Sequence, residues 1–398
     1  MLVEKTQPIY SIPSIRNYRW SVHLDLLRGL AAILVLLDHM RFLLFVDYSE
    51  ITNPTFFNKR FYFFTGLGHQ SVMIFFVLSG FFISASVIRT IKQKQWSWVN
   101  YLITRLTRLY IVLIPALFLT AFWDLLGIKI FGTGQDSFYG EKFHNNFLAT
   151  YKIWESLTWQ NFLGTIGFVQ KIFVNEFGSD KAVWSLAYEF WYYILFPAII
   201  LCVCVKSLKL RVLYGVLSSA ILLMVGSEIR LYFIVWLMGA LVSIGSTSRY
   251  ISRKIILNLL IFFSTLTLVI SLKIENFVAS EKVADFIIGI ATAVLIYFLA
   301  NDRSQIQKVG LYEKFAQGLA GCSYTLYLVH LPILCFIRAC IIGDRPWEPD
   351  VFHVLLALGI VAFVFLYAVV IYYFTEAKTD KLRKLIMSWV KSRNLNQA

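Results

Sequence analysis

The chain has few charged residues. Asp, Glu, Lys and Arg make up only 15% of its 398 residues, whereas about a quarter is usual in soluble proteins. Hydrophobic residues make up 58%, and the mean hydropathy is +0.68. This composition excludes an ordinary soluble domain and predicts an integral membrane protein.

Cysteine is also scarce. The five cysteines all lie in apolar runs, where they are expected to be small buried side chains: Cys202, Cys204, Cys322, Cys335 and Cys340. Their spacing matches neither a metal site nor a disulfide framework, so no metal is predicted. The first apolar run has full spanning length after a polar N-terminus, so we expect no cleavable signal peptide.

Ten apolar segments are long enough to span a bilayer. They lie near residues 24–46, 70–88, 109–126, 184–205, 212–227, 231–247, 255–272, 284–300, 316–341 and 351–374. With the N-terminus inside, Lys and Arg predominate in the predicted cytoplasmic loops, as the positive-inside rule requires. We therefore predict an all-α bundle of about ten transmembrane helices with both termini cytoplasmic. The net charge of +14 reflects this topology, and no nucleic-acid partner is predicted.

Residues 1–398 are expected to form a single membrane domain. Residues 1–23 form a cytoplasmic N-terminal segment, 127–183 a long outer loop, and 375–398 a basic cytoplasmic tail. The tail is typical of an amphipathic helix on the inner membrane surface. Within the outer loop, TWQNFLGTIGFVQ is too short to span and is expected to be re-entrant or interfacial.

The first apolar segment carries Asp25, Arg28, Asp38 and His39, although ionisable groups at membrane depth are costly and usually functional. Arg28 and His39 are eleven residues apart, so both project within ~20° of one face, ~16 Å apart along the helix axis. Asp25 lies on the same stripe and is expected to pair with Arg28. This arrangement suits a long ligand lying along the helix.

Counting 1.5 Å per residue places His39, Glu189 and His330 at one level in the outer half of the membrane. His39 is the best candidate for a general base, because neutral imidazole is the usual proton acceptor near neutral pH. The alternative is a histidine satisfied by a neighbouring helix. Glu189 either orients His39, binds an acceptor hydroxyl or makes a packing hydrogen bond. For His330, substrate contact and polar packing are equally compatible with the sequence.

Arg105 and Arg108 lie one turn apart in YLITRLTRLY, just before the third apolar segment. Together with Arg28 they are candidates for a cationic mouth that binds a phosphorylated ligand, since guanidinium pairs well with phosphate. The alternative is that they are plain positive-inside anchors. Gly80 and its small neighbours in FFVLSGFFIS are expected to allow close helix packing.

Five segments together resemble the acyltransferase 3 family of polytopic membrane acyltransferases. They are LDLLRGLAAILVLLDH, SVMIFFVLSGFFIS, RLTRLY, WSLAYEFWYYILFP and GCSYTLYLVHLPIL. The resemblance implies transfer of an acyl group, often acetyl, from cytoplasmic acyl-CoA to a hydroxyl, commonly on a cell-surface or exported glycan. The family's arginine–histidine pair maps to Arg28 and His39, and its RxxR motif to Arg105 and Arg108. The hydrolase-like outer domain of longer members is not expected here.

The resulting expectation is a membrane-bound O-acyltransferase of the cytoplasmic membrane. Acetyl-CoA is the expected donor, a glycan or lipid-linked saccharide the acceptor, and membrane lipid the surrounding partner. Two alternatives stay open at this point: a transporter or flippase for a lipid-linked or anionic solute, and an acyl-CoA-binding protein without catalysis. Direct transfer and an acyl-enzyme intermediate are both compatible with the sequence.

Overall fold

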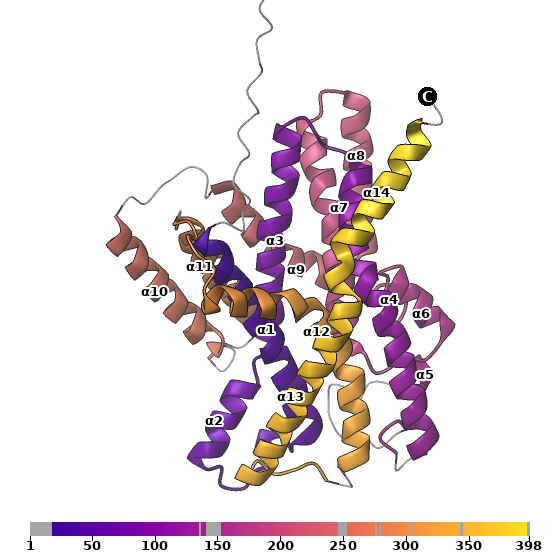
Figure 1. Cartoon of the computed structure of the whole chain (residues 1–398), viewed down its shortest axis with the longest axis vertical. Helices are drawn as coiled ribbons and strands as arrows, with labels where there is room; N and C mark the ends of the chain where they lie inside the picture. Colours follow the sequence, from indigo (N-terminus) through magenta and orange to yellow (C-terminus); the bar gives the residue numbers. More distant parts are fainter. Residues whose placement is uncertain are drawn as a thin grey trace, which may run out of the picture.

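The computed structural model describes residues 18–134, 137–140, 153–245, 253–274, 277–278, 280–302, 304–342 and 345–395. Its helices, in chain order, are α1 (Arg19–Leu44), η2 (Tyr48–Glu50), α2 (Phe56–Thr65), α3 (Gly68–Lys92), α4 (Trp98–Phe131), α5 (Ile153–Ser156), α6 (Trp159–Ile166), η3 (Lys181–Val183), α7 (Trp184–Cys204), α8 (Leu208–Met224), α9 (Gly226–Gly245), α10 (Lys254–Ser271), α11 (Glu281–Ala300), α12 (Leu311–Ile341), α13 (Val351–Phe374), η5 (Glu376–Lys378) and α14 (Thr379–Leu395). Figure 1 shows them as a bundle. The predicted all-α membrane fold is confirmed.

Nine stretches of the described chain are long and apolar enough to cross a membrane. They contain α1, α3, α4, α7, α9, α10, α11, α12 and α13. The remaining predicted span, residues 212–227, corresponds to α8, which has 17 residues. At 1.5 Å per residue α8 is ~26 Å long, somewhat short of a ~30 Å hydrocarbon core.

Close backbone contact between α3 and α9 is one organising feature of the bundle. A Cβ atom added to Gly80 or to Gly239 would lie 1.9 Å from a backbone carbonyl oxygen of the opposite helix. Nearby, the hydroxyls of Ser84 and Ser243 are 2.6 Å apart. Small residues thus let the two helices touch, as expected for membrane helix packing, and this supports the packing interpretation of the FFVLSGFFIS segment.

α1 lies against α3 and α12 in the centre of the bundle. Gly29 faces Leu319, with only 2.5 Å between an added Cβ and the leucine Cγ. Further along both helices His39 faces His330, so α1 and α12 run parallel. This pairing brings two distant parts of the sequence together at the level of the two histidines.

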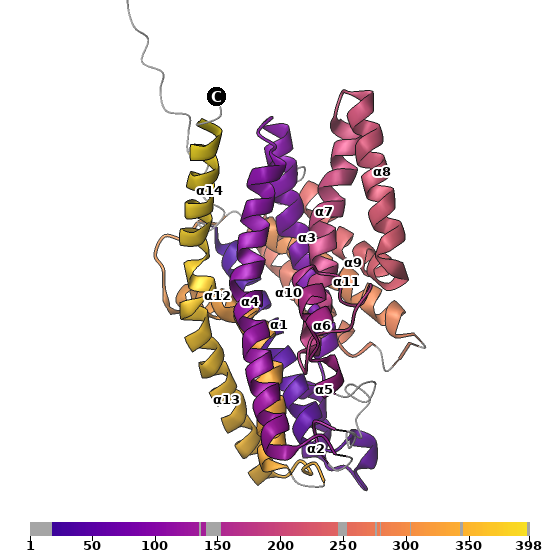
Figure 2. The ribbon, with the colours of Figure 1, turned by 90° about the vertical axis from the view of Figure 1, so that its right-hand side faces the viewer.

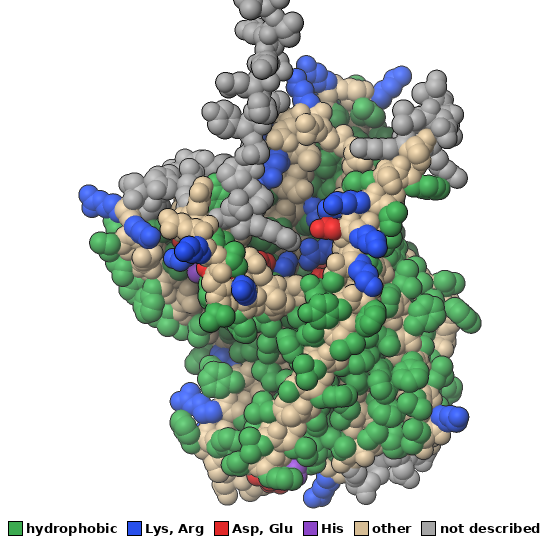
Figure 3. Space-filling view, in the orientation of Figure 1, with side chains coloured by type: hydrophobic (Ala, Val, Ile, Leu, Met, Phe, Trp, Pro, Cys, Tyr) green, Lys and Arg blue, Asp and Glu red, His purple; other side chains and the backbone are tan. Residues whose placement is uncertain are grey.

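Several helices extend beyond the bundle at one end, which we call the basic end. Figures 1 and 2 show the start of α4, the end of α3, the α7–α8 connection and α14 at this end. Lys and Arg side chains gather there around a hollow, while most of the rest of the visible face is hydrophobic (Figure 3). The positive-inside rule predicts that the basic end is cytoplasmic.

The C-terminal helix α14 continues along the direction of α13 and contacts α4 (Figure 2). Its predicted position on the inner membrane surface stays a prediction. The first 17 residues of the predicted N-terminal segment and the last three of the tail lie outside the described residues.

The predicted outer loop 127–183 is partly helical. α4 continues to Phe131, and α5, α6 and η3 follow, with residues 135–136 and 141–152 outside the described part. The Ile166 carbonyl accepts a hydrogen bond from Tyr110 of α4 (2.9 Å), and the Phe168 carbonyl accepts one from Trp191 of α7 (2.9 Å). The segment thus packs against α4 and α7, and its predicted re-entrant or interfacial position stays a prediction.

Candidate active site

Two buried histidines meet between α1 and α12. His39 Nδ1 lies 2.7 Å from His330 Nε2, and the two rings are nearly parallel with centroids 5.0 Å apart. His330 Nδ1 lies 2.9 Å from the Leu326 carbonyl oxygen, one turn earlier in α12. The exposed fractions are 9% for His39 and 1% for His330. We call these two residues the imidazole pair.

Hydroxyl groups lie beside the imidazole pair. The hydroxyls of Ser185 in α7 and Tyr327 in α12 are 2.8 Å apart. The Tyr327 ring lies 6.2 Å from the His330 ring and 6.0 Å from the Phe75 ring of α3, centroid to centroid. The surroundings of the pair are therefore contributed by three helices besides α1, and they include hydrogen-bonding as well as apolar groups.

Glu189, the third residue predicted at this level, makes its hydrogen bonds elsewhere. Its Oε1 accepts from Ser79 of α3 (3.0 Å) and from the Tyr193 hydroxyl. Among the described residues no hydrogen bond joins Glu189 to His39. Counting residues gives the height of a side chain in the membrane but not the direction in which the helix aims it. The bond to Ser79 is of the packing type, and a catalytic role for Glu189 stays a prediction.

Two of the arginines predicted to form a mouth lie near the same carboxylate. Arg28 forms the predicted ion pair with Asp25 (3.1 Å). Glu376, in the short helix η5, interacts electrostatically with both Arg28 and Arg108. Arg108 is exposed to solvent although it also interacts with Glu189.

Arg105, the third of these arginines, packs against two tyrosine rings. Its guanidinium lies 5.4 Å from the Tyr101 ring centroid and 5.9 Å from that of Tyr193. Its Nε is buried and has no hydrogen-bond partner among the residues that the structure describes. Because Tyr193 donates to Glu189, the arginines and the Glu189 region are contiguous. Arg28, Arg105 and Arg108, which we call the arginine group, are thus linked through shared carboxylate and tyrosine neighbours, and their role in binding a ligand stays a prediction.

Glu376 is a residue that the sequence analysis did not single out. Its Oε2 accepts hydrogen bonds from the backbone N–H (3.1 Å) and the hydroxyl (2.8 Å) of Thr325. Thr325 lies in the middle of α12, which bends as it crosses the bundle (Figure 1). The available signal was an acidic residue directly after the last apolar segment in an otherwise basic tail.

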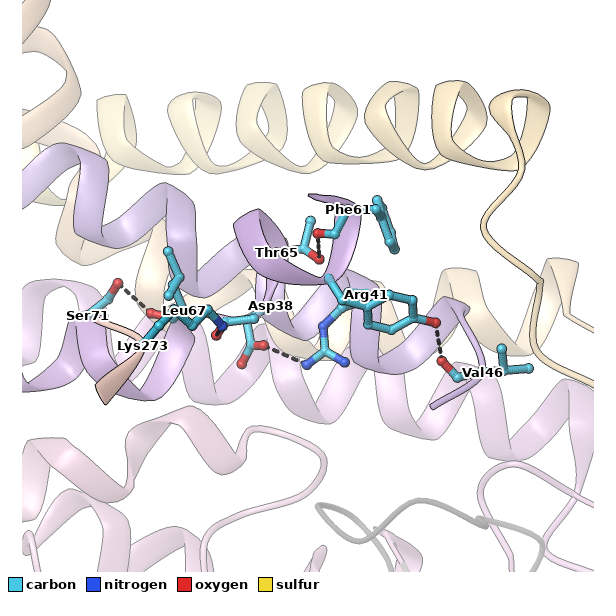
Figure 4. A network of polar contacts seen from close by, with 10 residues as sticks. Asp38, Arg41, Val46, Phe61, Thr65, Leu67, Ser71 and Lys273 are labelled. Atoms are coloured by element: carbon cyan, nitrogen blue, oxygen red, sulfur yellow. Dashed lines mark hydrogen bonds and ion pairs between the residues drawn. The ribbon is translucent and has the colours of Figure 1, made fainter. Parts of the chain in front are cut away.

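Asp38, the sequence neighbour of His39, takes part in a separate network (Figure 4). It forms an ion pair with Arg41 (2.8 Å), and the ammonium of Lys273 donates to the Gly66 carbonyl nearby (3.0 Å). A Cβ added to Gly68 would lie 2.4 Å from Asp38 Oδ2. Asp38 therefore fixes α1 against the start of α3 and is used structurally.

A second acidic group lies where the outer segment meets α4. Asp124 accepts hydrogen bonds from the backbone N–H and the hydroxyl of Ser179, both at 2.7 Å. Asp180 is completely buried, and among the described residues neither of its carboxylate oxygens has a hydrogen-bond partner of good geometry. Burial, together with the negative charges of Asp124 and Glu176, raises the pKa of Asp180 well above its ordinary value.

Within the described residues, no group of three or more His, Cys, Asp or Glu side chains is placed to hold a metal ion. The chemistry that this arrangement offers is proton transfer at the imidazole pair and anion binding at the arginines.

Comparison with known proteins gives a family. The family model of the acyltransferase domain matches residues 22–374, which is most of the chain and includes every residue of the imidazole pair and the arginine group. No curated protein and no solved structure matches the chain. The chain belongs to the acyltransferase 3 family, and it is a multi-pass membrane protein with an acyltransferase domain.

Proposed function

We propose that the chain is an O-acyltransferase of the cytoplasmic membrane that moves an acyl group, in the first instance acetyl, from cytoplasmic acetyl-CoA to a hydroxyl of a cell-surface or exported glycan. Support comes from the family, whose domain carries acyl transfer, and from two groups of residues that meet the needs of that reaction. One group binds anions and the other accepts a proton.

The arginine group suits the donor. Coenzyme A carries phosphates, and guanidinium groups bind phosphate through paired, charge-assisted hydrogen bonds. Arg108 is solvent-accessible, and Arg105 Nε has no hydrogen-bond partner in the described part of the chain. Both lie toward the basic end of the bundle, where acyl-CoA from the cytoplasm would enter. The thioester would then extend along α1 from Arg28 toward His39.

The imidazole pair suits the transfer step. The acceptor hydroxyl oxygen attacks the thioester carbon while His39 takes the hydroxyl proton. The new C–O bond replaces the C–S bond, and the thiolate of CoA leaves. The proton on His39 then passes to that thiolate, so the enzyme returns to its starting state. We propose direct transfer; an acyl-enzyme intermediate would instead give ping-pong kinetics.

The observation that carries the proposal concerns α1. This helix bears both Arg28 and His39, and His39 is buried against His330 of α12. A donor site and a proton acceptor on one helix are what transfer from a long phosphorylated thioester requires. The family assignment favours this transferase over a transporter. An acyl-CoA-binding protein without catalysis would bind donor but form no product.

The test is transfer of radiolabelled acetyl from acetyl-CoA to glycan in membranes that contain wild type, His39→Ala or His353→Ala. His353 lies near the outer end of α13 and pairs with Asp350, so it is a matched histidine control. We expect transfer by wild type and His353→Ala, and a loss of about 10²-fold or more in His39→Ala. Equal transfer by His39→Ala at equal protein level would overturn the assignment of the base.

A further inference from the structure

We infer that His330 is a positioning residue, which holds His39 in the tautomer that carries hydrogen on Nδ1 and the lone pair on Nε2. The inference rests on the proposed function only for its consequence in catalysis. The tautomer itself follows from the contacts of the imidazole pair and can be measured without any substrate.

The Leu326 carbonyl lies at the far end of the hydrogen-bond chain that runs through His330 to His39. A backbone carbonyl oxygen only accepts, and the Leu326 carbonyl lies 2.9 Å from His330 Nδ1. His330 Nδ1 therefore carries a hydrogen. In a neutral imidazole the other nitrogen then bears the lone pair, so His330 Nε2 is an acceptor.

The contact between the two rings then assigns the next hydrogen. His330 Nε2 lies 2.7 Å from His39 Nδ1, which leaves room for one hydrogen between the two nitrogens. If His39 donates, both rings are neutral. If His330 donates, it must be doubly protonated, and an imidazolium would be buried at 1% exposure with a neutral ring as its partner. Burying an unpaired charge is costly, so His39 is the donor.

The consequence concerns the reacting atom. With hydrogen on Nδ1, the basic nitrogen of His39 is Nε2, on the opposite side of the ring from His330. The two ring planes are parallel within 4°, as an in-plane hydrogen bond between the rings requires, and this bond restricts rotation of His39. His330 thus does for His39 what a carboxylate does in a hydrolase triad, where the partner of the base fixes its tautomer and orientation. Here the partner is an uncharged ring.

The first experiment measures the tautomer directly. Purified wild-type protein with 15N-labelled histidine, reconstituted in lipid nanodiscs, is compared by NMR with His39→Gln, which identifies the His39 resonances. We expect Nδ1 of His39 to be protonated and Nε2 to be of the unprotonated type. In His330→Leu we expect this preference to be lost. A His39 that carries its hydrogen on Nε2 in the wild type would overturn the inference.

The second experiment links the tautomer to turnover. A glutamine at position 330 can present its side-chain oxygen near the place of His330 Nε2, whereas leucine cannot. We expect His330→Leu to lower kcat about 10²-fold with KM nearly unchanged, and His330→Gln to recover most of that loss. Equal kcat in His330→Leu and wild type would contradict the positioning role. If wild type shows no acyl transfer, the proposed function fails, whereas the NMR result still decides the tautomer.

Discussion

Opposite charges accompany the arginines that we assign to the donor. Arg28 pairs with Asp25, and Arg108 interacts with Glu376 and Glu189. A bound phosphate therefore joins a mixed-charge group and does not enter a purely cationic pocket. Such a group favours a ligand that brings several anionic oxygens, because each guanidinium can share its five N–H donors between carboxylate and phosphate.

Removal of the Arg105 guanidinium tests the donor site at the level of one residue. Within the described part of the chain its Nε is buried without a hydrogen-bond partner, and we expect the guanidinium to bind the donor phosphate. Arg105→Ala should raise KM for acetyl-CoA about 10-fold with a smaller change in kcat, as expected when a charged hydrogen bond to bound substrate is lost. The measurement is steady-state kinetics in membranes.

Arg89→Ala is the matched control for Arg105→Ala. Arg89 lies in the last turn of α3 and is exposed, and we interpret it as a positive-inside anchor. We expect its KM to equal that of wild type. A KM that rises equally in both variants would indicate a general effect of positive charge at this end, not a specific phosphate site.

Asp180 gives a pH-dependent prediction. Burial raises its folded-state pKa well above the ordinary value, so the carboxyl favours folding most at low pH. This contribution is lost as pH rises from the ordinary pKa of an aspartate toward the raised one. Asp180→Asn removes the titration. We expect the variant to be more stable than wild type at pH 7.5, by about 1 kcal/mol, and the difference to shrink near pH 4.5.

The measurement for Asp180→Asn is thermal unfolding of the purified protein at both pH values. Asp350→Asn is a useful control, because hydrogen bonds from His353 lower the pKa of the exposed Asp350 carboxyl. No stabilisation is expected from that change at either pH. A constant difference for Asp180→Asn at the two pH values would refute the titration argument.

At the scale of elements, the contact between α3 and α9 is the tightest that we describe. Gly80→Ala places a methyl group 1.9 Å from a backbone oxygen of α9, so one helix must move. We expect a loss of about 1–3 kcal/mol in unfolding free energy, as in other overpacked sites. Ser79, next to Gly80 in α3, donates to Glu189. A shift of α3 would therefore disturb this hydrogen bond, and we expect activity to fall as well.

Gly359→Ala serves as the control for Gly80→Ala, since an added Cβ at Gly359 meets no atom within 4 Å. Thermal stability of the two purified variants in one detergent provides the comparison. Similar stability in both would mean that α3 and α9 separate easily, and the close packing would then not be a constraint on the fold.

The positions of the elements were predictable where hydrophobic length decides them. The apolar segments, the Asp25–Arg28 pair and the common level of His39 and His330 follow from helix geometry and spacing, whereas the direct contact between the two histidines does not. Polar extensions of a helix carry no such signal. α4 therefore begins at Trp98, earlier than the predicted 109–126 segment, and the small helix α2 went unpredicted.

Helix rotation and long-range contact explain the rest. The sequence places Glu189 at a height, but the packing of α7 against α3 directs it to Ser79. Glu376 meets Thr325 because the C-terminal turn returns to the bend of α12. Neither contact leaves a periodic pattern, since each depends on how two separate helices rotate and where one of them bends.

At the scale of the whole molecule, the account assigns different substrates to the two ends. Lys and Arg side chains surround the hollow at the basic end (Figure 3), and the positive-inside rule predicts that this end faces the cytoplasm. On the proposed function, acetyl-CoA would enter there and the exported glycan would reach His39 from the other side. Transfer would then cross part of the membrane, and the protein is expected to use donor from one face only.

The most direct test of this claim uses sealed membrane vesicles of both orientations, with labelled acetyl-CoA added outside. We expect labelled glycan from inside-out vesicles, whose cytoplasmic face is accessible. Right-side-out vesicles should give none until they are permeabilised, and His39→Ala should give none in either orientation. Transfer by intact right-side-out vesicles would contradict the account, because the donor would then reach the imidazole pair from the outer side.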